Sequence, residues 1–459
     1  MRRQILALAI ITAAFAWTSA AFAQKDDRPN ILFIMADDMG YADLGVFGAR
    51  HIKTPNIDSL AKEGLILTHG YANAPVCSPT RVGLLTGKYQ QRFALGLEEP
   101  VGPSRPSQPK GLPKELPTIA SVLKDRGYKT ALVGKWHLGD PPNNGPYEYG
   151  YDYFFGIHKG ASDYFRHRVV FDQQEEGDGL YVNAKPVERN GYLTRLFADE
   201  VINYLTTTDE TQPFFISLHF NAPHWPWEGP YDNHVSEGLN AGIQHRDAGT
   251  VEKYAEMMES MDANIGRVLE ILEDKGIADN TIVVFTSDNG AERFSDTWPL
   301  IGLKGELLEG GIRVPIIIRW PGHIEPGSKS EQVMTSMDFA PTFLAAAGGK
   351  SDKFDFDGVN LLPQLVGKRT KVERTLFWRF KTFDQAAVRQ GDMKYLRING
   401  QEHLFNIAQD PRERAELKDK YPEKFQELKS AYDEWNANML TYPEDSFSED
   451  VKRNYADRY

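Results

Sequence analysis

The chain has 459 residues, of which 41% are hydrophobic and 25% charged, and its formal net charge is -12. This composition excludes a fibrous or intrinsically disordered protein, and the length allows one large domain together with a smaller one. Acidic residues outnumber basic ones by 64 to 52, which disfavours general attraction to nucleic acid or anionic lipid. No nucleic-acid partner is therefore expected, and an anionic ligand would need a local cationic site.

The first 23 residues have the three parts of a secretory signal peptide. Arg2 and Arg3 form a basic start, Ile5 to Trp17 an apolar stretch, and residues 21–23 an A-x-A cleavage site. The apolar stretch is too short to span a bilayer, and no comparable stretch follows it. Residues 1–23 are therefore predicted to be removed, which predicts an exported protein, periplasmic or secreted, without a membrane span.

Strands and helices are predicted to alternate along most of the chain. Apolar runs of strand length are Asn30 to Ala36, Lys129 to Val133, Phe214 to Phe220 and Thr281 to Thr286. Apolar residues at helical spacing predict helices at Ser78 to Leu85, Thr118 to Arg126, Leu193 to Leu205 and Val251 to Leu272. The alternation indicates an α/β fold in which a large, mostly parallel sheet lies between layers of helices, and this domain is assigned to residues 24–366.

Beyond residue 366 the pattern changes to short strands. Four are predicted, at Thr375 to Phe380, Gln385 to Gln390, Met393 to Ile398 and His403 to Ile407. An amphipathic helix is predicted from Tyr421 to Met439, followed by a polar tail on the surface. Residues 367–459 are therefore predicted to form a small C-terminal domain with an antiparallel sheet and a helix.

Polar residues directly follow each of the four strands of the large domain. They are Asp37 and Asp38, then Lys135 and His137, then His224, and finally Asp288 and Asn289. Open α/β sheets bind ligands at the carboxyl ends of their strands. A single polar residue at the end of a strand is more often a turn or cap residue. Polar residues at the ends of four strands, however, indicate a ligand-binding site.

The chemistry of these residues is specific. Three carboxylates and one amide favour a hard divalent cation such as calcium or magnesium, and they come from Asp37, Asp38, Asp288 and Asn289. No cysteine pair or HExxH sequence supports zinc. The basic groups are suited to holding a tetrahedral oxyanion and moving protons, and they are Arg81, Lys135, His137, His224 and Lys304.

Cys77 is the only cysteine, so no internal disulfide can form. Most free cysteines are small buried hydrophobic residues, but the surroundings of this one carry a motif. The sequence from Pro75 to Gly87 contains C-S-P-T-R and resembles the first signature of the formylglycine-dependent sulfatases, and Gly127 to His137 resembles their second. The resemblance covers about residues 28–410 and is nearest to members of the arylsulfatase and N-acetylgalactosamine-6-sulfatase type, with an alkaline phosphatase-like fold.

The resemblance implies a cofactor set and a role for each motif residue. In that family the motif cysteine is oxidised to Cα-formylglycine by a maturation enzyme, and its hydrated aldehyde is the nucleophile. The implied ligands of Ca²⁺, with Mg²⁺ as the weaker choice, are Asp37, Asp38, residue 77, Asp288 and Asn289. The implied catalytic residues are Cys77, Arg81, Lys135, His137, His224 and Lys304.

The implied activity is sulfuric ester hydrolysis that releases inorganic sulfate from an aryl sulfate or a sulfated saccharide, in an exported bacterial protein. A polysaccharide or oligosaccharide fragment is the preferred substrate, because aromatic and basic residues gather in segments expected at the rim of the site. The candidates for substrate contact are Tyr164, Arg166, His167 and Trp225. The alternative for these side chains is that they pack the loops that carry them.

Two alternative functions stay open. One is a phosphonate or phosphate ester hydrolase that also uses formylglycine, although Lys135, His137 and Lys304 favour sulfate. The other is a sulfoglycan-binding protein without catalysis, in which Cys77 is never oxidised. The state of residue 77 and the turnover of matched sulfate and phosphate esters distinguish the three.

Overall fold

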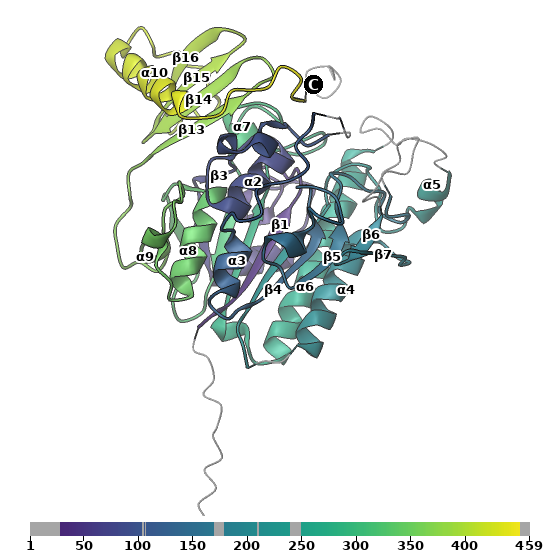
Figure 1. Cartoon of the computed structure of the whole chain (residues 1–459). Helices are drawn as coiled ribbons and strands as arrows, with labels where there is room; N and C mark the ends of the chain where they lie inside the picture. Colours follow the sequence, from purple (N-terminus) through teal and green to yellow (C-terminus); the bar gives the residue numbers. More distant parts are fainter. Residues whose placement is uncertain are drawn as a thin grey trace, which may run out of the picture.

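A computed structural model describes residues 28–102, 105, 107–168, 179–208, 211–238 and 249–449. The predicted signal peptide, residues 1–23, lies outside the described residues. Two sheets dominate the structure, a ten-stranded sheet in the larger part of the molecule and a four-stranded sheet formed near the C-terminus (Figure 1).

The ten-stranded sheet has the order β11-β2-β10-β9-β1-β8-β4-β5-β6-β7. Its strands are β1 (Asn30–Ala36), β2 (Leu65–Leu67), β4 (Lys129–Lys135), β5 (Tyr153–Ile157), β6 (Leu180–Val182), β7 (Lys185–Val187), β8 (Phe214–His219), β9 (Thr281–Ser287), β10 (Ile316–Arg319) and β11 (Ser328–Ser330). The central strands from β9 to β5 are parallel, whereas β10 and the β6–β7 pair run antiparallel to their neighbours. The predicted α/β fold with a mostly parallel sheet is confirmed.

Helices cover both faces of this sheet (Figure 1). The helices of this part are α1 (Pro55–Glu63), α2 (Cys77–Thr86), α3 (Ile119–Lys124), α4 (Leu193–Thr207), α5 (Asn233–Gly238), α6 (Val251–Asp274), α7 (Glu309–Ile312), α8 (Phe339–Ala346) and α9 (Leu362–Leu365). Leu32 and Ile34 of β1 pack with residues of α4 and α6, whereas Ile31 and Phe33 pack with residues of α2, α3 and α8. All seven residues of β1 are buried because alternate side chains enter the two cores.

The second part of the molecule is an antiparallel sheet with one long helix on it. The strands β13 (Thr375–Phe380), β14 (Gln385–Gln390), β15 (Met393–Ile398) and β16 (Gln401–Asn406) pair in sequence order, and α10 (Pro422–Ala437) packs against them. A two-stranded sheet, β3 (Gly70–Tyr71) with β12 (Met334–Thr335), completes the strands. The predicted small C-terminal sheet and helix are confirmed, while the boundary at residue 366 stays a prediction.

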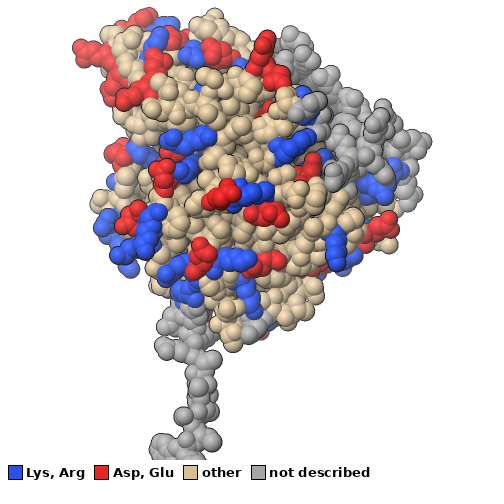
Figure 2. All heavy atoms as spheres, viewed as in Figure 1, with Lys and Arg blue, Asp and Glu red and all other residues tan. Residues whose placement is uncertain are grey.

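The surface carries both signs of charge. On the face shown in Figure 2, lysines and arginines are interspersed with aspartates and glutamates. None of the described helices is long and apolar enough to span a membrane. Since this face offers no broad basic patch, an anionic ligand would depend on cationic side chains gathered at one site.

Candidate active site

Four neighbouring parallel strands deliver the predicted site residues to one edge of the sheet. Strands β9, β1, β8 and β4 lie side by side, and their last residues lie within one residue of one another in the pairing register. Asp37 and Asp288 follow β1 and β9, and the Asp288 amide donates a hydrogen bond to the Ala36 carbonyl at 3.1 Å. Because parallel strands share a carboxyl edge, residues that are far apart in sequence meet there.

The structure brings together every predicted catalytic and metal-binding residue in one buried group, which we call the catalytic cluster. It consists of Asp37, Asp38, Cys77, Arg81, Lys135, His137, His224, Asp288, Asn289 and Lys304. The most exposed of them, His137, is 5% exposed. Three carboxylates and three permanent cations balance one another, so the cluster is close to neutral before any ligand binds.

Asp38 is the centre of the cluster. Its Oδ2 accepts a hydrogen bond from Lys304 Nζ at 2.7 Å and lies 3.5 Å from His224 Nε2. Its Oδ1 accepts from Asn289 Nδ2 at 2.8 Å and lies 3.8 Å from Cys77 Sγ. The backbone of Asp38 has a φ of 68°, a left-handed conformation that is uncommon for residues other than glycine and that clusters at functional sites.

Asp37 and Asp288 are each paired with a cation. Lys135 Nζ donates to Asp37 Oδ2, and Arg81 donates to Asp288 Oδ2 from Nε at 3.0 Å and from Nη2 at 2.8 Å. Arg81 also donates to the carbonyl of Lys135 at 2.8 Å. Arg81 is therefore a link between α2, the turn after β9 and the end of β4, rather than a surface ion pair.

The donor set fits a hard cation. Ligand atoms of Asp37, Asp38, Cys77 and His224 all lie within 4.8 Å of one another. Among the described residues, Asp37 Oδ1 and Asn289 Oδ1 are buried without a hydrogen-bond partner. Burial and the neighbouring Asp288 carboxylate raise the pKa of Asp37 well above its usual value. Oxygen atoms left free in a crowded acidic site are what a divalent cation binds.

Cys77 is the first residue of α2 and is 1% exposed. Burial raises the pKa of its thiol well above the usual value, although Lys135 and Lys304 act in the opposite direction. The thiolate is the reactive form of cysteine. An unmodified Cys77 would therefore be a poor nucleophile in this position.

The ring of His137 has one nitrogen fixed and one free. Nε2 lies 2.8 Å from the Val101 carbonyl, which can only accept, so Nε2 carries the hydrogen. Nδ1 is buried and has no partner among the described residues. Gly160 lies against the ring, and a Cβ at position 160 would come within 2.3 Å of Cε1. Neither Val101 nor Gly160 could be predicted as part of the site, because a backbone carbonyl and a lone glycine belong to no motif.

His224 is held in the opposite sense. Its Nδ1 donates to the Trp225 carbonyl at 2.7 Å, which leaves Nε2 facing the cluster. The Tyr164 hydroxyl donates to the carbonyls of His224 at 2.8 Å and Asn221 at 2.9 Å. Burial, followed by the charge of Lys135, lowers the pKa of His224 well below its usual value.

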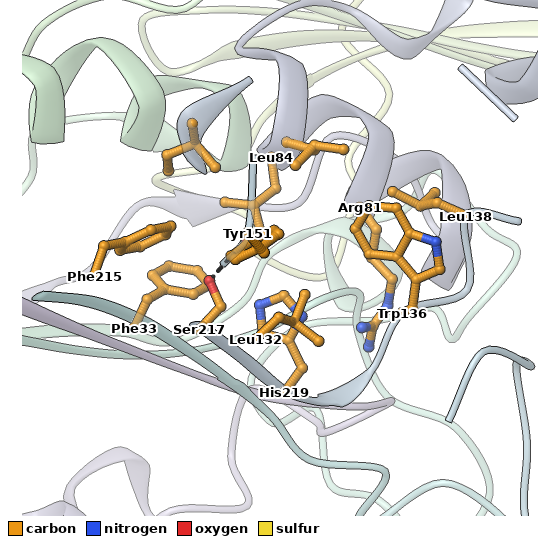
Figure 3. A pocket seen from close by; sticks show the side chains of 12 residues that line it. Phe33, Arg81, Leu84, Leu132, Trp136, Leu138, Tyr151, Phe215, Ser217 and His219 are labelled. Carbon is orange, nitrogen blue, oxygen red and sulfur yellow. Dashed lines mark hydrogen bonds between the residues drawn. The ribbon is translucent and has the colours of Figure 1, made fainter. Parts of the chain in front are cut away.

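A small cavity lies behind Arg81, on the face of the sheet that α2 covers (Figure 3). Most of its lining is apolar, including Phe33, Leu132 and Trp136, and none of it comes from Cys77, His137, His224 or Lys304. Ser217 and Tyr151 hydrogen-bond to each other at its wall, at 3.1 Å. The cavity is therefore part of the support of Arg81 and not a place for substrate.

Comparison with known proteins identifies the family. Residues 29–349 match the sulfatase family, and residues 304–439 match the family described as N-sulphoglucosamine sulphohydrolase, C-terminal. The chain belongs to the sulfatase family. It is a sulfuric ester hydrolase, as the resemblance predicted, and formylglycine chemistry is the general feature of this family.

Relatives of this sulfatase include well-covered enzymes and solved structures. The human N-acetylgalactosamine-6-sulfatase is 34% identical over 390 residues, which cover 79% of this chain and 70% of that protein. The structure of Ps i-CgsB is 29% identical with a TM-score of 0.81, covering 93% and 96% of the two chains. The PsFucS1 sulfatase from Pseudoalteromonas sp. is 27% identical with a TM-score of 0.74, covering 91% of each.

Of the four residues predicted to contact substrate in this sulfatase, two are buried and two are at least partly exposed. Tyr164 is fully buried and supports the His224 segment, and His167 is 4% exposed with Nε2 2.9 Å from the Gly191 carbonyl. Arg166 is exposed and Trp225 is half-buried. Direct substrate contact stays a prediction for Arg166 and Trp225, whereas the geometry of Tyr164 and His167 is that of supporting residues.

Proposed function

We propose that this sulfatase releases sulfate from a sulfated polysaccharide or oligosaccharide, with residue 77 as formylglycine and one calcium ion. The observation that carries the proposal is that Lys135, Lys304 and His224 gather around residue 77 in a buried site, with His137 held by the loop whose Val101 amide bonds to Ser78. The saccharide class is supported by the names of relatives. One is N-acetylgalactosamine-6-sulfatase, and another, 30% identical, was solved with k-i-k-neocarrahexaose.

The metal would be held by the oxygen-rich side of the cluster. We propose Asp37, Asp38, Asn289 and residue 77 as ligands, with Asp288 joining them while Arg81 holds its other oxygen. When bound, calcium supplies positive charge that stabilises negative charge on neighbouring oxygens. Calcium is preferred to magnesium because the set offers several carboxylate oxygens and a neutral amide oxygen, and calcium takes more protein ligands than magnesium does.

The nucleophile depends on residue 77. When present, formylglycine would supply a hydrated aldehyde with one hydroxyl as the nucleophile for sulfur and a second hydroxyl whose deprotonation would break the C–O bond to sulfate and restore the aldehyde. Arg81 and Lys135 keep the adjacent carboxylates in place through their ion pairs, and their positive charge stabilises the sulfate oxygens. His137 has a free Nδ1, so it can accept a proton there while the Val101 carbonyl fixes its ring.

The leaving group would depart on the side of His224 and Lys304. His224 presents Nε2 to the cluster. When the ring is protonated, a form that an anionic sulfate ester would favour, Nε2 can donate a proton to the ester oxygen. Lys304 is a buried ammonium 2.7 Å from Asp38, and it would stabilise the negative charge that develops on that oxygen. A sugar hydroxyl is a poor leaving group, so a saccharide substrate needs both residues.

The wider assignment follows the sequence. We propose that residues 1–23 direct export, that residues 24–366 form the catalytic domain, and that residues 367–439 together with the tail close one side of the site. Maturation requires a formylglycine-generating enzyme as a transient partner.

Three measurements on protein from its native host test the proposal. Mass spectrometry of the peptide containing residue 77 should show the aldehyde, whereas a thiol throughout would favour a binding protein. Turnover of an aryl sulfate should exceed that of the matching aryl phosphate diester, and the reverse would favour the phosphonate or phosphate hydrolase. A panel of defined sulfated oligosaccharides should contain better substrates than the aryl sulfate. If no oligosaccharide of the panel is a better substrate, the saccharide class is refuted.

A further inference from the structure

The C-terminal segment 442–449 is paired with the loop 98–102 beside the catalytic cluster. The Glu99 amide donates to the Phe447 carbonyl at 3.0 Å, and the Glu449 amide donates to the Glu99 carbonyl at 2.7 Å. The pairing is an isolated parallel bridge. The sequence predicted only a polar tail on the surface, so this attachment is a feature of the tertiary structure.

The side chain of Glu99 anchors the segment. It is 1% exposed, and its carboxylate accepts hydrogen bonds from the Tyr442 hydroxyl at 2.5 Å and the Ser448 hydroxyl at 3.1 Å. It also accepts from the backbone amide of Lys381, in the hairpin between β13 and β14, at 2.8 Å. Three donors from two distant segments therefore converge on one buried carboxylate.

Lys381 makes a second anchor. Its ammonium donates to the carbonyl of Ser446 at 2.6 Å, to the Ser446 hydroxyl at 2.9 Å and to the carbonyl of Glu444 at 3.1 Å. The ammonium thus satisfies main-chain acceptors that would otherwise need water. We call Glu99, Lys381 and the segment 442–449 the tail clamp.

The loop held by the clamp touches the catalytic cluster through Val101. The Val101 amide donates to Ser78 Oγ at 2.7 Å, and Ser78 directly follows Cys77. The Val101 carbonyl accepts from His137 Nε2 at 2.8 Å. Val101 is only two residues from Glu99, so the clamp and the catalytic histidine share one short piece of backbone.

We propose that the tail clamp is a positioning element for His137. By fixing loop 98–102, it keeps the Val101 carbonyl where it holds the ring with Nδ1 unprotonated and free of other hydrogen bonds. This inference rests on the proposed role of His137 as the proton acceptor. A looser clamp lets the ring change tautomer or rotate, which slows proton transfer to Nδ1 without altering the sulfate-binding cations.

The test uses the full chain and removes the donors of the clamp. In the double variant Tyr442→Phe, Ser448→Ala we expect kcat to fall about tenfold, because a hydrogen bond to a charged group is worth roughly that factor. KM should stay within about twofold, and the loss should be the same on an aryl sulfate and a sulfated sugar. Glu444→Gln is the matched control on the same segment, since the Glu444 side chain is exposed and the clamp uses only its carbonyl.

Repeating the clamp variant in a His137→Ala enzyme distinguishes positioning of His137 from general support of the fold. In His137→Ala, the clamp variant should cause no further loss of the residual turnover, although it should lower the melting temperature in both backgrounds. If the clamp variant lowers turnover by the same factor with and without His137, it does not act through His137. Unchanged kcat in the otherwise wild-type enzyme would overturn the proposal as well.

A readout independent of turnover completes the test. Nitrogen NMR of histidine-labelled protein should show the His137 ring protonated at Nε2 in the intact chain and a mixture of tautomers in the clamp variant. An unchanged tautomer would overturn the proposal. If the intact enzyme hydrolyses no sulfate ester, the proposed function fails, and the tautomer measurement still decides whether the clamp fixes the ring.

Discussion

Two buried groups of charged residues differ in which of their polar atoms lack a hydrogen-bond or ion-pair partner. The first is the catalytic cluster, and the second, which we call the interface cluster, consists of Tyr71, Glu309, Lys394 and Glu413 between the large part of the molecule and the C-terminal sheet. Lys394 lies 3.0 Å from Glu309 Oε1 and 2.8 Å from Glu413 Oε1. Glu309 Oε2 accepts from the Tyr71 hydroxyl at 2.6 Å, and Glu413 Oε2 accepts from the Glu309 amide at 2.7 Å.

Every carboxylate oxygen of the interface cluster therefore has a hydrogen-bond or close ion-pair partner, and for Glu413 Oε1 that partner is only the ion pair with Lys394. In the catalytic cluster, by contrast, Asn289 Oδ1 and His137 Nδ1 have no hydrogen-bond partner among the described residues, and Asp37 Oδ1 has only a 3.9 Å ion pair with Arg81. An unpaired buried polar atom costs about 1–3 kcal/mol. Burial and charge alone thus do not distinguish the two clusters. The catalytic cluster differs in that three atoms without a hydrogen bond gather in one group, so variants of the two clusters should behave differently.

The largest expected effect comes from removing the nucleophile. Cys77→Ala should lower kcat by at least about 10⁴-fold, in the range seen when a catalytic nucleophile is removed, while the melting temperature stays close to that of the wild type. Turnover of an aryl sulfate and a thermal melt measure the two quantities. Wild-type turnover by the variant would refute the formylglycine mechanism.

Removal of the metal should affect both activity and stability. The carboxylates of Asp37, Asp38 and Asp288 repel one another, and a ligand present at 1,000 times its Kd stabilises the native state by about 4 kcal/mol. A chelator selective for calcium should therefore abolish turnover and lower the melting temperature, and added calcium should restore both. An unchanged melting temperature with full activity would contradict the metal site, and recovery with magnesium alone would reassign the ion.

The third effect separates leaving-group assistance from the handling of the nucleophile. Loss of a general acid costs about 10²–10⁴-fold when the leaving group needs protonation. His224→Ala should therefore lower kcat/KM far more on a sulfated sugar than on an activated aryl sulfate. Arg81→Ala should lower both about equally, because Arg81 holds Asp288 in either reaction. Equal losses for His224→Ala would assign that residue to binding or support.

In the interface cluster, the corresponding change should reduce stability and leave the chemistry intact. Lys394→Met leaves Glu413 buried without a cation and Glu309 with only the 3.5 Å ion pair to Arg313, which should cost about 3–5 kcal/mol of unfolding free energy. Lys429→Met, which breaks a more exposed pair with Glu402, should cost less than about 1 kcal/mol. Denaturant titrations measure both losses. A large fall in kcat of the folded Lys394→Met enzyme would contradict the prediction, because it would mean that the interface cluster also supports catalysis.

The smallest expected effect concerns the pH dependence of the tail clamp. Burial raises the pKa of Glu99 to about 7, although Tyr442, Ser448, the Lys381 amide and Arg379 favour the charged form. A carboxyl group whose pKa is higher in the folded state loses stabilising free energy as pH rises from its unfolded pKa toward 7. The loss should reach about 3 kcal/mol above pH 7 and be absent in Glu99→Gln.

Unfolding free energies of wild type and Glu99→Gln between pH 5 and 8 provide the measurement. The stability of the wild type relative to the variant should decrease steadily over this interval. A difference that does not change with pH would mean that Glu99 ionises at the same pH in the folded and unfolded states.

Much of the fold was accessible to sequence analysis because its central elements are long and strongly patterned. The strand at Asn30–Ala36 has the predicted limits. The long helix predicted from Val251 to Leu272 begins at Val251 and runs two residues further, to Asp274. No strand was predicted for β6, β7 or β10, each of three or four residues. Such short segments become strands by pairing with a neighbour, and that pairing is not visible in their own sequence.

By itself, the sequence determined the class of fold, the family and the residues of the catalytic cluster, because strand periodicity and motif spacing are local properties of the chain. Only the tertiary structure decided which atoms of those residues are free. It placed Tyr164 beneath His224, joined Val101 to His137, and brought the tail to Glu99. These contacts join segments that are distant along the chain, and several are made by backbone carbonyls. They therefore cannot be predicted from the residue types in the sequence.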